Sequence, residues 1–213
     1  MNESQKKIFL LVDDHVLIRL SLEFIIRELF LGAVILQANS LEEANDILNS
    51  QVINYVIIDI SFPEGNSLGF VSDLVKEREW VKVLIYSGYE DDFYALSFLR
   101  AGACGFLSKQ SNKEEIKTAL TNMVVKGKHI PADLQNKILD AFLQKQTLLP
   151  IEELSTREME VAKLLVEGQG NLEVAVILNT KQSTISTIKS RIFQKLGISN
   201  LPELIELFKF YRG

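Results

Sequence analysis

Short, almost wholly apolar runs alternate with longer amphipathic stretches over residues 8–126. The apolar runs occupy residues 8–14, 33–38, 55–60, 81–86 and 104–107. The amphipathic stretches have helical periodicity and cover residues 16–30, 40–49, 67–77, 91–101 and 113–126. Buried strands that alternate with helices are typical of a parallel sheet covered by helices on both faces. The pattern therefore predicts an α/β domain with a doubly wound, five-stranded parallel sheet.

The alternation ends near Gly127, and a different architecture follows. Residues 128–150 are polar, contain two prolines and predict a helical linker. Beyond them, helical patterns cover residues 155–167, 171–178, 182–196 and 201–211, and Ser155 and Glu158 have the spacing of a capping box. Three residues separate the second of these patterns from the third, which indicates a helix-turn-helix. We therefore expect a first domain at residues 1–127, a linker at 128–150 and a small all-α domain at 151–213.

The composition argues against a membrane protein and for a reducing compartment. No apolar run approaches the roughly 20 residues that cross a bilayer, and the N-terminal residues do not have the pattern of a signal peptide. The chain has one cysteine, Cys104, so it forms no internal disulfide. Cys104 lies among small residues, where a buried, inert thiol is expected. We expect a cytoplasmic protein with no membrane partner.

Polar side chains follow the carboxyl ends of four predicted strands. Asp13 and Asp14 end the first strand, Asp59 ends the third, and Ser87 and Lys109 follow the fourth and fifth. Ligands gather at this edge of an open parallel sheet, and three neighbouring carboxylates require a compensating cation. Oxygen ligands suit Mg²⁺, whereas a hydroxyl and a lysine suit a phosphoryl group. Any one of these residues could simply end a strand, but the set of five predicts a site for Mg²⁺ and a phosphoryl group.

The segments around these strand ends share one resemblance. Residues 10–15 read Leu-Leu-Val-Asp-Asp-His, residues 56–60 read Val-Ile-Ile-Asp-Ile, and residues 102–109 read Gly-Ala-Cys-Gly-Phe-Leu-Ser-Lys. With Pro63 and residues 86–87, they resemble the receiver domain of two-component response regulators over residues 6–127. The resemblance implies a flavodoxin-like domain in which a histidine kinase or a phosphotransfer protein phosphorylates Asp59.

The same resemblance implies a role for each polar residue of the pocket. Mg²⁺ would be held by the carboxylates of Asp13, Asp14 and Asp59 and by the backbone carbonyl of Ser61. Ser87 and Lys109 would contact the phosphoryl group. Phe106 would be an aromatic switch that turns inward when Ser87 moves toward the phosphate; a plain core aromatic is the alternative.

The C-terminal helices carry a second resemblance. Residues 154–161, Glu167-Gly168, Asn171 and residues 183–197 resemble the LuxR-type helix-turn-helix. Together, the two resemblances identify the chain as a member of the NarL/FixJ subfamily of response regulators. The helix at residues 182–196 would then enter the major groove of double-stranded DNA. The helix at residues 201–211 would supply contacts of a homodimer in the active state.

The periodicity of residues 182–196 separates a core side from a polar side. Five apolar residues share one stripe: Ile185, Ile188, Ile192, Phe193 and Leu196. The stretch from Lys181 to Lys195 contains four basic residues and no acid. Polar and basic side chains of this kind contact phosphates and base edges. The candidate DNA-binding residues are Lys181, Ser183, Thr184, Ser186, Thr187, Lys189, Ser190, Arg191, Gln194 and Lys195.

The charge distribution keeps other functions open. The net charge is −5, and residues 151–213 contain as many basic as acidic residues. Ser186 stands where the family often has lysine, and Ile188 where histidine or tyrosine is common. A phosphorylation-gated switch whose C-terminal domain binds a protein is therefore an alternative. DNA binding without phosphorylation fits the intact acidic pocket less well. An enzyme is not expected, because the sequence has no nucleophile–base pair or cofactor loop.

Overall fold

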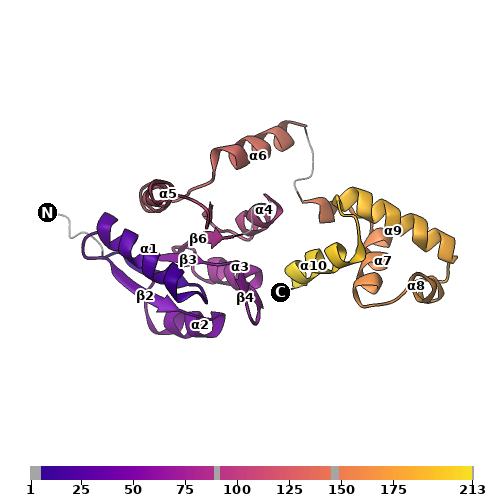
Figure 1. Cartoon of the computed structure of the whole chain (residues 1–213), viewed down its shortest axis with the longest axis horizontal. Coiled ribbons are helices and arrows are strands. Elements are labelled where there is room, and N and C mark those ends of the chain that lie inside the picture. Colours follow the sequence, from indigo (N-terminus) through magenta and orange to yellow (C-terminus); the bar gives the residue numbers. More distant parts are fainter. Residues whose placement is uncertain (1–5, 89–91, 145–148, 213) are drawn as a thin grey trace. The chain divides into compact units, whose positions relative to one another are not determined.

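The five apolar runs form a single parallel sheet in the computed structural model (Figure 1). The strand order is β2-β1-β3-β6-β7. The strands are β1 (Ile8–Val12), β2 (Val34–Ala38), β3 (Tyr55–Ile58), β6 (Lys82–Ser87) and β7 (Gly105–Ser108). The structure describes residues 6–88, 92–144 and 149–212. The predicted doubly wound, five-stranded parallel sheet is confirmed.

Four helices connect successive strands of this sheet, a fifth follows the last strand, and together they cover both faces. They are α1 (Val16–Leu29), α2 (Leu41–Ser50), α3 (Leu68–Glu77), α4 (Asp92–Arg100) and α5 (Lys113–Lys126). Side chains of α1 and α5 pack in one core with Phe9, Leu11 and Ile57 of the strands. Leu10 and Val12 alternate with these and are buried on the opposite face, because successive side chains of a strand point to opposite sides. Residue 91, where the fourth helix was predicted to begin, lies outside the described residues.

A short hairpin after β3 was not predicted. It pairs β4 (Ser61–Phe62) with β5 (Gly65–Asn66) in antiparallel register. Strands of two residues are too short to leave a period-two pattern in a sequence. Gly65 has a φ of 141°, which only glycine adopts without strain.

The predicted linker contains a helix, as expected. This helix, α6 (Ala132–Gln144), begins directly after Pro131. The chain divides after Leu139 into two units, residues 1–139 and 140–213, and this division lies within the segment predicted as the linker. Residues 145–148 of that segment lie outside the described residues.

The second unit is entirely helical among its described residues. A 3-10 turn, η1 (Pro150–Glu153), precedes α7 (Thr156–Val166), α8 (Asn171–Ile177), α9 (Gln182–Leu196) and α10 (Leu201–Arg212). Their apolar faces form one core, to which Leu165, Val174 and Leu204 contribute. Asn179, with a φ of 48°, turns the chain between α8 and α9. The small all-α domain with a helix-turn-helix is therefore confirmed. No helix in the described ranges is long and apolar enough to span a membrane.

Candidate functional site

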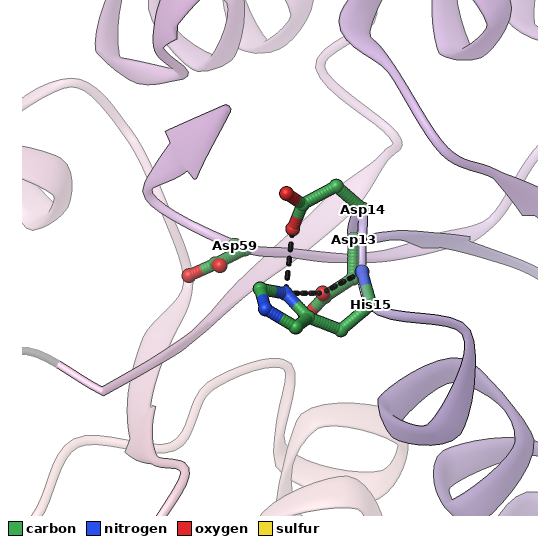
Figure 2. Close-up of side chains that lie close together, drawn as sticks. All are labelled: Asp13, Asp14, His15 and Asp59. Carbon is green, nitrogen blue, oxygen red and sulfur yellow. Dashed lines mark hydrogen bonds and ion pairs between the residues drawn. The ribbon is translucent and has the colours of Figure 1, made fainter. Parts of the chain in front are cut away.

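Three carboxylates meet at the carboxyl edge of the sheet. Asp13 and Asp14 directly follow β1, and Asp59 directly follows β3 (Figure 2). The two strands pair in parallel with Val12 opposite Ile58, and the Asp59 N–H donates to the Val12 carbonyl over 3.0 Å. Asp13 and Asp59 are buried, at 3% and 7% exposure, whereas Asp14 is exposed. The register of β1 and β3 therefore brings the predicted acidic cluster together.

The Lys109 ammonium bridges the two buried carboxylates. It lies 2.7 Å from Asp13 Oδ2 and 2.7 Å from Asp59 Oδ2. The Lys109 N–H donates to the Ser87 carbonyl over 2.7 Å, which fixes the residue at the end of β7. Two buried carboxylates side by side require a positive charge between them, and Lys109 supplies it.

The pKa values at the site reflect this burial and pairing. Burial raises the pKa of Asp59 above its ordinary value, and the charge of Asp13 adds to this, although the Lys109 ammonium opposes it. Burial acts to lower the pKa of Lys109, but its pairing with the carboxylates of Asp13 and Asp59 outweighs burial and raises the pKa. Lys109 therefore stays protonated at neutral pH and acts as a fixed cation.

The cluster has the donor set of a divalent-cation site. Oxygens of Asp13, Asp14 and Asp59 and a ring nitrogen of His15 all lie within 4.8 Å of one another. Asp13 Oδ2 is a buried atom whose contact with Lys109 is an ion pair without hydrogen-bond geometry. Clustered carboxylate oxygens, one of them buried without a hydrogen bond, fit a hard cation such as Mg²⁺. Ser61, whose backbone carbonyl was predicted to join this set, begins β4 two residues after Asp59.

Three residues near the cluster were not predicted to take part. The His15 ring nitrogen Nδ1 lies 2.6 Å from Asp14 Oδ1 and 3.2 Å from Asp13 Oδ1, as Figure 2 shows. An Arg19 guanidinium N–H donates to the Asp13 backbone carbonyl. The buried Ser67 hydroxyl donates to the Asp59 backbone carbonyl over 2.6 Å instead of capping α3. These contacts hold the backbone and side chains of the acidic residues in place, and no motif in the sequence indicates them.

The predicted hydroxyl and aromatic switch lie on neighbouring strands. Ser87 ends β6, is fully buried and is opposite Ser108 of β7. Phe106 of β7 is opposite Ile85 and is 7% exposed. Phe106 is one of the residues that line a cavity of about 620 Å³.

The second predicted site is the outer face of α9. Ile185, Ile192 and Leu196 are buried in the core of the second unit, while Ile188 and Phe193 are half-buried. The side chain of Asn171, at the start of α8, donates to Ser186 Oγ over 3.1 Å and ties the two helices together. The predicted residues that are exposed on or beside α9 are Lys181, Ser183, Thr184, Ser186, Thr187, Ser190, Arg191, Gln194 and Lys195.

Several of these polar side chains already have partners within the unit. The hydroxyls of Ser186, Thr187 and Ser190 donate to backbone carbonyls one turn earlier and keep their oxygens as acceptors. The Lys189 ammonium lies 5.4 Å from the centroid of the Phe193 ring. The Lys195 ammonium lies 2.7 Å from Glu158 Oε2 and donates to the Glu153 carbonyl over 3.0 Å. Lys195 thus fixes α9 within the unit, a role that the sequence did not predict.

The fold and the pocket define a class of protein: an α/β domain with a pocket of carboxylates and one lysine, joined to a helix-turn-helix unit. Residues 9–121 match the family described as response regulator receiver domain, and residues 152–208 match the family of bacterial regulatory proteins described as luxR family. The chain belongs to the response regulator family. With its receiver and LuxR-type domains it is a response regulator of the NarL/FixJ type, which confirms the prediction.

Relatives match this chain over most of both lengths. The chain is 29% identical over 202 residues to the fimbriae Z protein of Escherichia coli K12, which covers 95% of this chain and 96% of the relative. It is 27% identical to the response regulator UvrY of Escherichia coli K12, over 93% of this chain and 91% of the relative.

Solved structures with the same fold include DNA complexes. The two-component response regulator RcsB bound to DNA matches 97% of this chain, with a TM-score of 0.74 and 20% identity over 99% of its own length. RcsB from Salmonella enterica serovar Typhimurium bound to a promoter matches 97%, over all of its own length, with a TM-score of 0.77 and 20% identity. At this identity, the likeness establishes the fold alone.

Proposed function

We propose that this response regulator is phosphorylated on Asp59 and thereby controls the binding of its helix-turn-helix unit to DNA. One observation carries the first half of this proposal: the Lys109 ammonium bridges Asp13 and Asp59, both buried, at the carboxyl edge of the sheet. A buried carboxylate beside a fixed cation, in a pocket that excludes most water, is well placed to attack an incoming phosphoryl group.

The proposed reaction transfers a phosphoryl group from a phosphohistidine. An Asp59 carboxylate oxygen attacks phosphorus in line, the new O–P bond forms as the P–N bond to the donor histidine breaks, and the donor imidazole leaves with the electron pair. Lys109 neutralises charge on the transferring oxygens, and the Ser87 hydroxyl donates a hydrogen bond to the product. The donor is a histidine kinase or a phosphotransfer protein. The chain is a regulator rather than a metabolic enzyme.

Mg²⁺ is the proposed cofactor of this pocket. The carboxylates of Asp13, Asp14 and Asp59 and the Ser61 backbone carbonyl would hold it, since hard oxygen donors suit the ion. Bound there, the ion would neutralise charge on the phosphoryl oxygens. Lys109, which balances both buried carboxylates, would then be available to contact the phosphoryl group.

The outer face of α9 is the proposed DNA-reading surface. Arg191 is exposed on this face, and Ser183 and Thr187 present acceptor oxygens beside it. Ser, Thr and Arg side chains of this kind contact bases and phosphates. Lys195, Lys189 and Lys181 extend the surface toward the phosphate backbone. Lys195 can contact a phosphate while it stays paired with Glu158, because an ammonium group has three N–H donors. We propose that the protein acts in the cytoplasm and binds double-stranded DNA as a homodimer.

Binding of a protein by the second unit is the alternative, and one observation favours it. The α8 side chains of Leu172, Val176 and Ile177 are 61%, 74% and 54% exposed. Apolar side chains that are exposed together on one short helix are typical of an interaction site. The unit is also neutral overall, which weakens the long-range attraction to DNA.

Selection of duplex DNA from a pool of genomic fragments separates the two functions. The full chain is incubated with the pool with and without Mg²⁺ and a small phosphodonor. We expect discrete fragments to be enriched and the enrichment to strengthen on phosphorylation, but not in Asp59→Asn. No enrichment in either state, with Asp59 demonstrably phosphorylated, would favour the protein-binding alternative.

A further inference from the structure

A backbone bridge ties the start of the linker to the outer edge of β7. β7 is the last strand of the sheet and pairs with β6 on one edge only. On its other edge, the His129 N–H donates to the Cys104 carbonyl over 3.0 Å, and the Phe106 N–H donates to the His129 carbonyl over 3.0 Å. His129 therefore acts as a one-residue parallel strand beside Gly105.

This bridge explains the glycine at position 105. A Cβ atom there would lie 2.1 Å from the His129 carbonyl oxygen and 2.9 Å from its carbon. The clash is with backbone, which cannot rotate away as a side chain does. Gly105 is therefore required by the close approach of the linker rather than by its own dihedral angles.

A second contact fixes the linker a few residues further on. Leu134, in the first turn of α6, is only 2% exposed. Leu134, Pro131, His129 and Phe106 all line the same cavity of about 620 Å³. We call residues 129–134 the strap, because its first residue is held by the backbone bridge and its last is buried beside the same cavity.

We infer that the strap relays the state of Phe106 to α6 and so to the helix-turn-helix unit. The inference rests on the proposed phosphorylation of Asp59. Phe106 takes part at both ends of the strap: its N–H donates to the His129 carbonyl, and it lines the same cavity as Leu134. When the ring turns inward behind Ser87, the cavity that Phe106 and Leu134 line changes shape and the bridge is strained. The strap then loosens, and the start of α6 is no longer held.

Amide hydrogen exchange in the full chain tests the relay directly. We expect exchange at the Phe106 and His129 amides to become at least tenfold faster when Mg²⁺ and a small phosphodonor are added. The Ile57 amide, in the centre of the sheet, is the internal control and should not change. Phosphorylation of Asp59 is followed in the same sample by mass spectrometry.

A pair of leucine substitutions in α6 provides the second measurement. Leu134→Ala removes the buried anchor, whereas Leu139→Ala removes a leucine that is 55% exposed on the same helix. We expect Leu134→Ala to speed exchange at His129 without phosphorylation and to bring the DNA affinities of the two phosphorylation states to within about twofold. Leu139→Ala should behave like the unmodified sequence.

The outcomes separate this inference from the proposed function. If Asp59 is not phosphorylated, the proposed function fails, and the relay fails with it. If Asp59 is phosphorylated but the His129 amide exchanges at an unchanged rate, the relay alone is wrong. A Leu134→Ala chain that folds and keeps the full response of DNA affinity to phosphorylation would also overturn the relay.

Discussion

The Lys195 ammonium at the end of α9 lies 2.7 Å from the carboxylate of Glu158 in the first turn of α7. The same carboxylate accepts hydrogen bonds from the Ser155 N–H and hydroxyl, each over 2.8 Å. The Lys195 ammonium, followed by the Ser155 N–H, lowers the pKa of Glu158 to about 2. One buried carboxylate therefore caps α7 and also fixes the end of the candidate DNA-reading helix.

We predict that Glu158→Gln destabilises the second unit by about 1 kcal/mol at pH 7. The amide oxygen of Gln can still accept from Ser155, but the ion pair with Lys195 is lost. Exchange at the Ile192 amide in increasing urea, measured in the full chain, gives the free energy of opening. Glu160→Gln is the matched control, because Glu160 pairs with Arg157 on the exposed side of the same helix.

The same pair predicts a pH dependence. The pKa of the Glu158 carboxyl group is 4.5 in the unfolded chain and about 2 in the folded protein. Its charged form therefore stabilises the folded state fully above pH 4.5. This stabilisation is lost as the pH falls toward 2. The difference in the free energy of opening between the parent chain and Glu158→Gln should therefore be constant above about pH 5 and shrink below about pH 4. A difference that stays constant down to low pH would contradict the assigned pairing.

At the acidic pocket, we predict that Asp59→Asn abolishes incorporation of phosphate from a small phosphodonor. It should also weaken the stabilisation that Mg²⁺ gives to the first unit, because one ligand is replaced and ligand binding to the folded state stabilises it by mass action. Mass spectrometry and thermal unfolding with and without Mg²⁺ measure the two effects. Asp46→Asn, on the exposed side of α2, should leave both unchanged, and equal phosphate incorporation in Asp59→Asn would refute the site.

The sheet and the pocket were predictable because both follow from short-range patterns. Apolar runs mark the strands, and in a parallel sheet all their carboxyl ends meet at one edge. Asp13, Asp59 and Lys109 are 46 and 50 residues apart in sequence, yet strand order alone brings them together. The capping box at Ser155 and Glu158 was predictable in the same way, since its two residues lie within one turn.

The missed contacts depend on side-chain direction or on pairing outside regular strands. Ser67 was expected only to begin a helix, and its hydroxyl instead supports the Asp59 carbonyl. The bridge at His129 involves a single residue, which leaves no periodic signal. The ion pair of Lys195 joins residues 37 positions apart, so a lysine expected to contact DNA phosphates also has a structural partner.

On the candidate DNA interface, we predict that Arg191→Ala weakens binding to a selected duplex by roughly tenfold to a hundredfold, as expected for the loss of one base or phosphate contact. If Arg191 contacts a phosphate, the loss should be uniform across sequences and the salt dependence should fall by about one ion. If it contacts a base, the sequence preference should relax at one position. Lys163→Ala, exposed on α7, is the charge-matched control, and an unchanged affinity of Arg191→Ala would exclude this face.

Finally, we predict that the only thiol of the chain is almost inert in the folded protein. Burial raises the pKa of Cys104 from 9.0 to about 12, and the thiolate is the reactive form. This difference lowers the thiolate fraction roughly a thousandfold, so alkylation by iodoacetamide at about pH 8 should be slower than in urea by orders of magnitude. Cys104→Ser measures background labelling at other residues. Native labelling at a rate near that of the unfolded chain would show that β7 opens readily, because Cys104 lies at its start and its carbonyl accepts from His129.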